Sequence, residues 1–246
     1  MSKVIYIPKS QQQIMPLFDG KFIENKPIPF PDKGKSNAYS NLFYWAHLEA
    51  LQTAEFPLHP HKGFEIMTFV LKGSLEHFDT ATKVWTPLSA GGVQVIQAGS
   101  GVEHAERITE GSELFQIWFD PDMSKTLKES AQYKDYQINM FQAEKQNGIE
   151  TIVYVGKNGP IAHKTEGISI KKIGFNEGGY HFDLNNTITY SLYLLNGSLV
   201  LNNQEMGKDG FVILHDTDSL SIMAQEGAEL FMIESPAEIN YKRYVD

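Results

Sequence analysis

The stretch FVLKGSL at residues 69–75 occurs a second time, in altered form, as YLLNGSL at residues 193–199. A further pair follows in the same order, with EGSELF at residues 110–115 and EGAELF at residues 226–231. Each segment joins a Gly-bearing turn to an apolar run of strand length. Coincidence between similar hairpins is the alternative. Two pairs in one order favour two copies of a single β domain.

The rest of the chain is also typical of a β protein. Short apolar runs recur between Gly-, Asn- and Asp-bearing turns, at residues 66–71, 92–96, 114–119, 190–195, 211–214 and 230–233. This even spacing favours a sandwich or a barrel over an alternating β–α fold. The best helical candidate, residues 123–133, has few apolar positions and is expected to be a connector. We therefore predict two β domains, at residues 1–134 and 135–246.

Composition restricts the chemistry that the chain can perform. Its 246 residues include 21 Lys and Arg, 30 Asp and Glu, eight His and no Cys, for a net charge of −9. The absence of Cys excludes disulfides and thiolate ligands, so any metal is held by His and carboxylates. The negative charge and the lack of a basic stripe argue against direct nucleic-acid binding. No apolar run suits a signal peptide or a membrane span, so we expect a cytoplasmic protein without membrane contact.

The sharpest local motif is the pair His59 and His61 in LHPHKGFE at residues 58–65. Side chains two residues apart project from the same face of a strand, so both imidazoles can grip a metal from one side. Glu65 has the same parity. It is a candidate acceptor that orients a ligand imidazole, and equally an ordinary strand residue.

A second motif, GSGVEHAE at residues 99–106, strengthens the first. His104 and Glu106 are again two residues apart and share a face if the segment is extended. Three imidazoles and one carboxylate suit Fe(II), Mn(II), Cu(II), Ni(II) or Zn(II). Open coordination positions beside such a set favour a redox-active metal over structural zinc. Hydrogen bonding of these residues to their neighbours is the structural alternative.

Three segments together resemble the pirin family of the cupin superfamily: HPHKGFE at 59–65, KGSLEHFD at 72–79 and AGSGVEHAE at 98–106. The run LFQIWF at 114–119 resembles the strand that follows in that family. The resemblance is specific over residues 55–121, and the second half is similar mainly in pattern.

This resemblance implies an all-β bicupin: two tandem cupin β-barrels of the jelly-roll type with few short helices. It implies one mononuclear divalent metal in the N-terminal barrel, with His59, His61, His104 and Glu106 as ligands. Fe(II) is favoured, with Cu, Mn, Ni or Zn as alternatives. The repeat places no such set in the second half, where the matching positions are Asp183, Asn185 and residues 220–222. His181 and His215 could form a second site, but we expect the second barrel to lack a metal.

The resemblance supports two functions. The first is a dioxygenase of the quercetin 2,3-dioxygenase type, in which a flavonol-like substrate loses its 3-hydroxyl proton to a carboxylate and reacts with dioxygen, releasing carbon monoxide. Glu106 is the candidate base, with Glu65 in reserve. The second is an iron-dependent redox-sensing protein that acts on a protein partner, as a transcriptional co-regulator, without turnover. A metal-binding bicupin with neither role is the third alternative. We rank the enzyme first.

Overall fold

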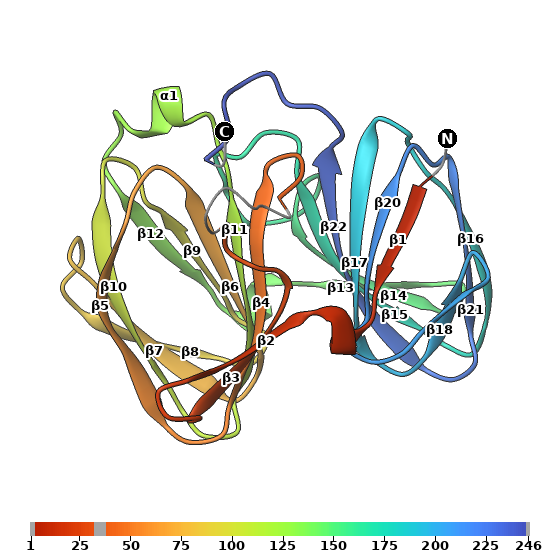
Figure 1. The fold of residues 1–246 in the computed structure, drawn as a ribbon, viewed down its shortest axis with the longest axis horizontal. Helices are drawn as coiled ribbons and strands as arrows, with labels where there is room; N and C mark the ends of the chain where they lie inside the picture. Colours follow the sequence, from red (N-terminus) through yellow and green to blue (C-terminus); the bar gives the residue numbers. More distant parts are fainter. Residues whose placement is uncertain (1–2, 32–37, 245–246) are drawn as a thin grey trace. The chain divides into compact units, whose positions relative to one another are not determined.

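The computed structural model describes residues 3–31 and 38–244, and these divide into two compact units. The first barrel consists of described residues within 13–140, together with 163–166 and 240–244. The second barrel consists of residues 3–12, 141–162 and 167–239. Figure 1 shows that each unit is built almost wholly from strands. The predicted all-β, two-barrel fold is therefore confirmed.

The first barrel pairs a seven-stranded sheet with a four-stranded sheet, and all pairings are antiparallel. The larger sheet has the order β12 (Gln132–Tyr136), β9 (Val93–Gln97), β6 (Glu65–Lys72), β11 (Glu113–Phe119), β4 (Leu42–Ala50), β3 (Phe22–Ile28), β2 (Gln13–Leu17). The smaller has the order β5 (Ala54–His61), β10 (Val102–Ile108), β7 (Ser74–Asp79), β8 (Trp85–Ser89). A core cluster that includes Phe22, Leu48, Leu75 and Ile108 joins the two sheets.

The second barrel repeats this plan. Its larger sheet has the order β1 (Lys3–Ile7), β20 (Phe211–His215), β17 (Ile188–Asn196), β22 (Ala228–Pro236), β15 (Ser169–Phe175), β14 (Ile149–Val155), β13 (Ala143–Gln146). Its smaller sheet has the order β16 (Gly178–Asp183), β21 (Ser219–Ala224), β18 (Leu199–Leu201), β19 (Gln204–Met206). Short 3-10 turns occupy Lys9–Gln11 and Ile138–Met140. Strand for strand, the two sheet orders correspond, which is the structural basis of the sequence repeat.

The two repeated motifs contact each other in both barrels. Gly73 and Gly197 adopt φ angles of 73° and 78°, in the left-handed region that favours glycine. A Cβ on Gly73 would lie 2.2 Å from Oγ of Ser112, and one on Gly197 would lie 2.5 Å from the carbonyl oxygen of Gly227. The KGS turn therefore packs directly against the EGS turn in the first barrel, and the NGS turn packs against the EGA turn in the second. This contact explains why both motifs recur together.

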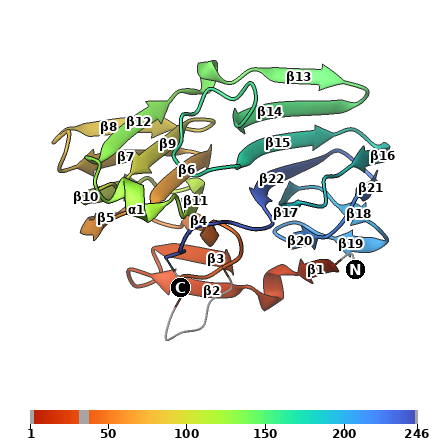
Figure 2. The same ribbon diagram turned by 90° about the horizontal axis from the view of Figure 1, so that it is seen from above.

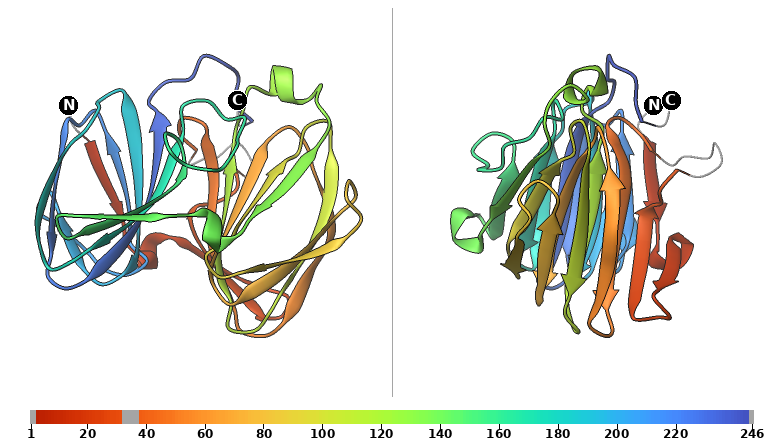
Figure 3. Two further views of the ribbon diagram at one scale, coloured as in Figure 1. Left: turned by 180° about the vertical axis from the view of Figure 1, so that it is seen from behind. Right: turned by 90° about the vertical axis from the view of Figure 1, so that its left-hand side faces the viewer.

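The division between the units differs from the predicted boundary at residue 134. β1 pairs with β20 and completes the second barrel, whereas β12 pairs with β9 and completes the first. Figure 2 shows β12 beside β9, and Figure 3 shows the red N-terminal strand among the blue strands of the second barrel. The pairing partner of an edge strand is set by long-range contacts, so the local pattern that defined the repeat could not assign β1.

The predicted helix at residues 123–133 is also shorter than expected. The helix α1 spans Met123–Thr126, and the side chain of Asp122 caps it by accepting a hydrogen bond from the backbone of Ser124. Gln132 onward forms β12 instead. Without an apolar stripe, a single short turn has little tertiary packing to extend it. No helix in the described ranges is long and apolar enough to cross a membrane.

Candidate metal centre

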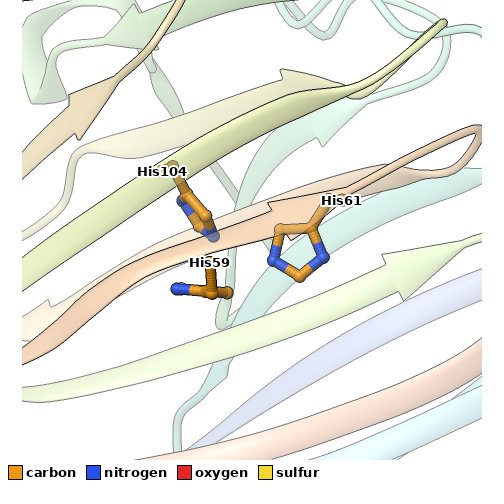
Figure 4. Close-up of side chains that lie close together, drawn as sticks. All are labelled: His59, His61 and His104. Carbon is orange, nitrogen blue, oxygen red and sulfur yellow. The ribbon is translucent and has the colours of Figure 1, made fainter.

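Two neighbouring strands of the smaller sheet bring three predicted ligands together. β5 and β10 pair with His104 opposite His59 and Val102 opposite His61. Because His59 and His61 are two residues apart on β5, both side chains project to the face that His104 occupies. Figure 4 shows the three imidazoles side by side, two from β5 and one from β10.

The distances between these side chains suit a single metal ion. The ring centroid of His59 lies 4.8 Å from that of His61 and 4.3 Å from that of His104. The ring centroids of His61 and His104 are 4.7 Å apart. One ligand nitrogen from each residue lies within 4.8 Å of the other two. Among the described residues of this barrel, no other group of three such side chains is as compact.

Burial keeps two of the imidazoles neutral. His104 is fully buried and His61 is 8% exposed. Desolvation, followed by the charge of His59, lowers the pKa of His61 to about 3. Desolvation and the neighbouring imidazoles hold the pKa of His104 far below its ordinary value. Neutral imidazole is the form that coordinates a metal.

The hydrogen bonding of the three imidazoles also leaves ring nitrogens available to a metal. Nε2 of His61 and both ring nitrogens of His104 are buried and have no hydrogen-bond partner. Nδ1 of His59 lies 2.8 Å from the carbonyl oxygen of Pro57, which leaves Nε2 available to a ligand. Buried polar atoms normally have partners, so the orphaned nitrogens of His61 and His104 in so compact a group indicate a site that binds a ligand. The residues present fit a divalent transition metal.

Glu106, the fourth predicted ligand, lies on β10 with His104, but its carboxylate contacts Gln116. Its carboxylate is 2% exposed and accepts hydrogen bonds of 3.3 and 3.0 Å from the side-chain amide of Gln116. Desolvation raises the pKa of Glu106 to about 7, against the lowering effect of the Gln116 bond. Within the described residues, the compact group comprises the three imidazoles without Glu106. The register between β5 and β10 shifts between His104 and Glu106, which separates the carboxylate from the group.

Glu65 has hydrogen-bond partners that the sequence did not predict. It is 1% exposed, and its carboxylate accepts hydrogen bonds from the backbone N–H groups of Lys164 and Thr165, at 2.6 and 2.7 Å, and from the hydroxyl of Thr165. These donors occupy both carboxylate oxygens. Glu65 therefore anchors residues 163–166 to the first barrel, and its part as a reserve base or as an acceptor for a ligand imidazole stays a prediction.

The family match agrees with this geometry. Residues 32–119, which include all four predicted ligands, match the family model described as Pirin. This segment is therefore similar to the pirin family. The predicted resemblance is thereby confirmed.

Individual relatives extend the comparison. A quercetin 2,3-dioxygenase of Escherichia coli K12 is 44% identical over 71 residues, covering 27% of this chain and 30% of the relative. A pirin-like protein of Caulobacter vibrioides is 40% identical over 79 residues, covering 31% of this chain and 34% of the relative. The aligned segments thus span about a third of these curated relatives.

A solved structure shows that the likeness in fold is more extensive. The crystal structure of the bacterial pirin YhhW from Escherichia coli in complex with nickel(II) has a TM-score of 0.80. It covers 96% of this chain and 100% of its own at 18% identity. At that identity the likeness concerns the fold, and it supports the predicted bicupin architecture.

A cavity of about 620 Å³ lies beside the ligands of the first barrel. It is lined by Phe30, Pro60, His61, Lys62, Phe64, Trp118, Leu127 and Tyr244. The Phe64 and Trp118 rings stack with centroids 5.1 Å apart, and the Trp118 ring is 5.2 Å from that of His61. The resemblance seen in the sequence includes Phe64 and Trp118, within HPHKGFE and LFQIWF. It carried no signal for Phe30 and Tyr244, which come from segments far along the chain.

His77 of the first barrel is another buried imidazole close to the three candidate ligands. Both of its ring nitrogens are buried without a hydrogen-bond partner. The ring stacks on Tyr133 at 4.5 Å and lies 5.3 Å from the ring of His104. Desolvation lowers the pKa of His77 to about 4. Burial alternates along β7, and His77 shares the buried face with Leu75 and Asp79, which was the available signal.

The second barrel has no comparable group. In its described part, no three His, Asp or Glu ligand atoms lie as close together. His181 is exposed beside Ser221, and His215 lies 3.0 Å from the hydroxyl of Thr189. The strand pair that corresponds to β5 and β10 carries Phe182 opposite Leu220.

Proposed function

We propose that this protein is a mononuclear-metal dioxygenase of the quercetin 2,3-dioxygenase type, acting on a flavonol or a similar enolic aromatic substrate. The observation that carries the proposal is the convergence of three imidazoles beside an aromatic cavity, two of which, His61 and His104, are buried with ring nitrogens that have no hydrogen-bond partner. The names of its relatives support the same class of reaction.

His59, His61 and His104 would hold the metal, with Glu106 as a fourth ligand or as a base. Fe(II) is the favoured metal, and Cu(II), Mn(II), Ni(II) and Zn(II) share the same ligand preferences. A bound divalent metal supplies Lewis acidity, which lowers the pKa of a substrate hydroxyl group.

The side chains around the ligands have complementary roles. The Phe64 and Trp118 rings give the cavity an aromatic wall on which a planar aromatic ring can pack. Glu106 would accept the hydroxyl proton of the substrate. Gln116 orients Glu106, because the indole N–H of Trp118 donates to Oε1 of Gln116 at 3.1 Å and leaves the amide nitrogen facing the carboxylate.

Metal binding is tested first and separately. Protein purified without chelators and then loaded with Fe(II) under argon is expected to hold about one metal ion per chain by elemental analysis. His104→Ala should lose this metal, whereas His181→Ala, which removes an exposed imidazole from β16, should retain it. Equal metal contents in the two variants would contradict the ligand assignment.

Turnover is tested with each metal in turn. Reconstituted protein, quercetin and dioxygen should show loss of flavonol absorbance with release of carbon monoxide, and His61→Ala should abolish both. His181→Ala is again the control. If the metal binds at one equivalent but no metal gives turnover, the enzyme proposal fails, and an effect of iron oxidation state on a protein partner's affinity would favour the redox-sensing alternative.

A further inference from the structure

The second barrel encloses a cavity where the first barrel has its imidazoles. The cavity has a volume of about 490 Å³ and is lined entirely by residues of the second barrel. Its walls come from alternate positions of β14, β15, β17, β21 and β22, which therefore all point to the inner face. The space is the lumen of the barrel.

The strand pair β16–β21, which corresponds to β5–β10, places Phe182 opposite Leu220, whereas the sequence offset pointed to Asp183 as the counterpart of His59. Phe182 and Leu220 face each other across the β16–β21 pair, and Ile222 continues the same face. Leu220 and Ile222 are each 3% exposed. Replacement of imidazoles by these side chains removes metal binding and creates a surface that favours an apolar ligand.

The volume also argues for a ligand. Side chains usually fill the interior of a small barrel, and an unfilled lumen forfeits the packing contacts of its lining. A volume of about 490 Å³ lies within the range of pockets that bind drug-sized molecules.

Polar side chains also line the lumen: Glu144, Gln146, Asn147 and Asp183, and in addition an ion pair. Lys171 and Glu234 line the cavity and form an ion pair with a distance of 2.6 Å, in which both side chains are less than a third exposed. Because the two charges compensate each other, the pair offers hydrogen-bonding groups without a net charge.

We propose that the lumen of the second barrel is a binding site for an uncharged, largely apolar small molecule, aromatic or alicyclic, whose single hydroxyl or carbonyl group reaches the Lys171–Glu234 pair. This site is separate from the metal centre and does not depend on the proposed dioxygenase activity.

The test uses the neutral fluorescent probe N-phenyl-1-naphthylamine and the full chain. The probe should bind one molecule per chain with increased fluorescence and should raise the Tm of the protein, because it binds the folded state. Ile222→Trp fills the lumen and should weaken binding at least about tenfold. Met223→Trp adds the same side chain to the outward face of β21, where Met223 is 51% exposed, and should leave binding unchanged.

Two further variants remove the remaining ambiguity. Thr151→Trp narrows the lumen from β14 and should also weaken binding, which covers the case in which Ile222→Trp does not fold. Trp118→Leu alters only the cavity of the first barrel and should have no effect on the probe. The proposal is overturned if the probe does not bind, if Met223→Trp weakens binding as much as the lumen variants do, or if Trp118→Leu abolishes binding.

Discussion

At the scale of single residues, the candidate site depends on hydrogen bonds that fix buried polar groups. Gln116 is the connecting residue, since it accepts from Trp118 and donates to Glu106. Such a chain allows the amide only one orientation. The position of the Glu106 carboxylate is therefore set by side chains from β11 and not by β10 alone.

We expect Gln116→Leu to destabilise the metal-free protein by about 1–3 kcal/mol, because the buried Glu106 carboxylate loses its donor. Chemical denaturation of four proteins measures the effect: the parent, Gln116→Leu, Glu106→Leu and the double variant. In the Glu106→Leu background the loss caused by Gln116→Leu should be much smaller, which gives a coupling energy for the pair. Equal losses in both backgrounds would show that Gln116 acts through packing and not through the carboxylate.

The residue scale is also where sequence prediction was most effective. The sequence predicted that the three imidazoles lie together, because His59 and His61 are two residues apart and a second motif contains His104. The carboxylates were harder to interpret. Glu65 shares the strand parity of the ligands, but its partners belong to residues 163–166, about 100 residues along the chain. A local pattern contains no information about such partners.

At the scale of elements, each barrel contains a close contact between its two repeated turns. The contact excludes a side chain on Gly73 in the first barrel and on Gly197 in the second. Two features of these positions require glycine: the positive φ, and the lack of space for a Cβ atom. The sequence repeat signalled both positions before their contact was known.

Gly73→Ala should therefore cost more stability than a positive φ alone. Gly111 is the matched control, since its φ is 78° but no atom lies within 4 Å of a Cβ built on it. We expect Gly111→Ala to lower the free energy of unfolding by about 1 kcal/mol, from backbone strain. Gly73→Ala should lower it by about 3 kcal/mol or more, because Ser112 must also move. Urea denaturation of the two variants decides the point, and similar losses would contradict the contact.

At the scale of the whole molecule, the two barrels share a strand order but differ in what their interiors contain. The first contains imidazoles and a carboxylate, and the second contains aliphatic and aromatic side chains. Identical strand orders with different linings show that the fold and the chemistry of the site are specified by separate sets of residues. The repeat predicted the shared strand order. It did not predict the exchange of edge strands, in which β1 completes the second barrel and β12 completes the first.

The exchange of edge strands predicts how the chain responds to truncation. Deleting residues 1–7 removes β1 and leaves the edge of β20 unpaired, so backbone amides of Phe211–His215 should exchange with deuterium faster. The corresponding strand of the first barrel, Val93–Gln97, keeps its partner β12 and should exchange at the parent's rate. Hydrogen exchange followed by mass spectrometry of both peptides measures this difference. Metal uptake by the first barrel is the internal control, and it should stay at the parent's stoichiometry. Equal acceleration in both peptides would show that β1 supports the first barrel as well, contrary to the pairing that assigns it to the second.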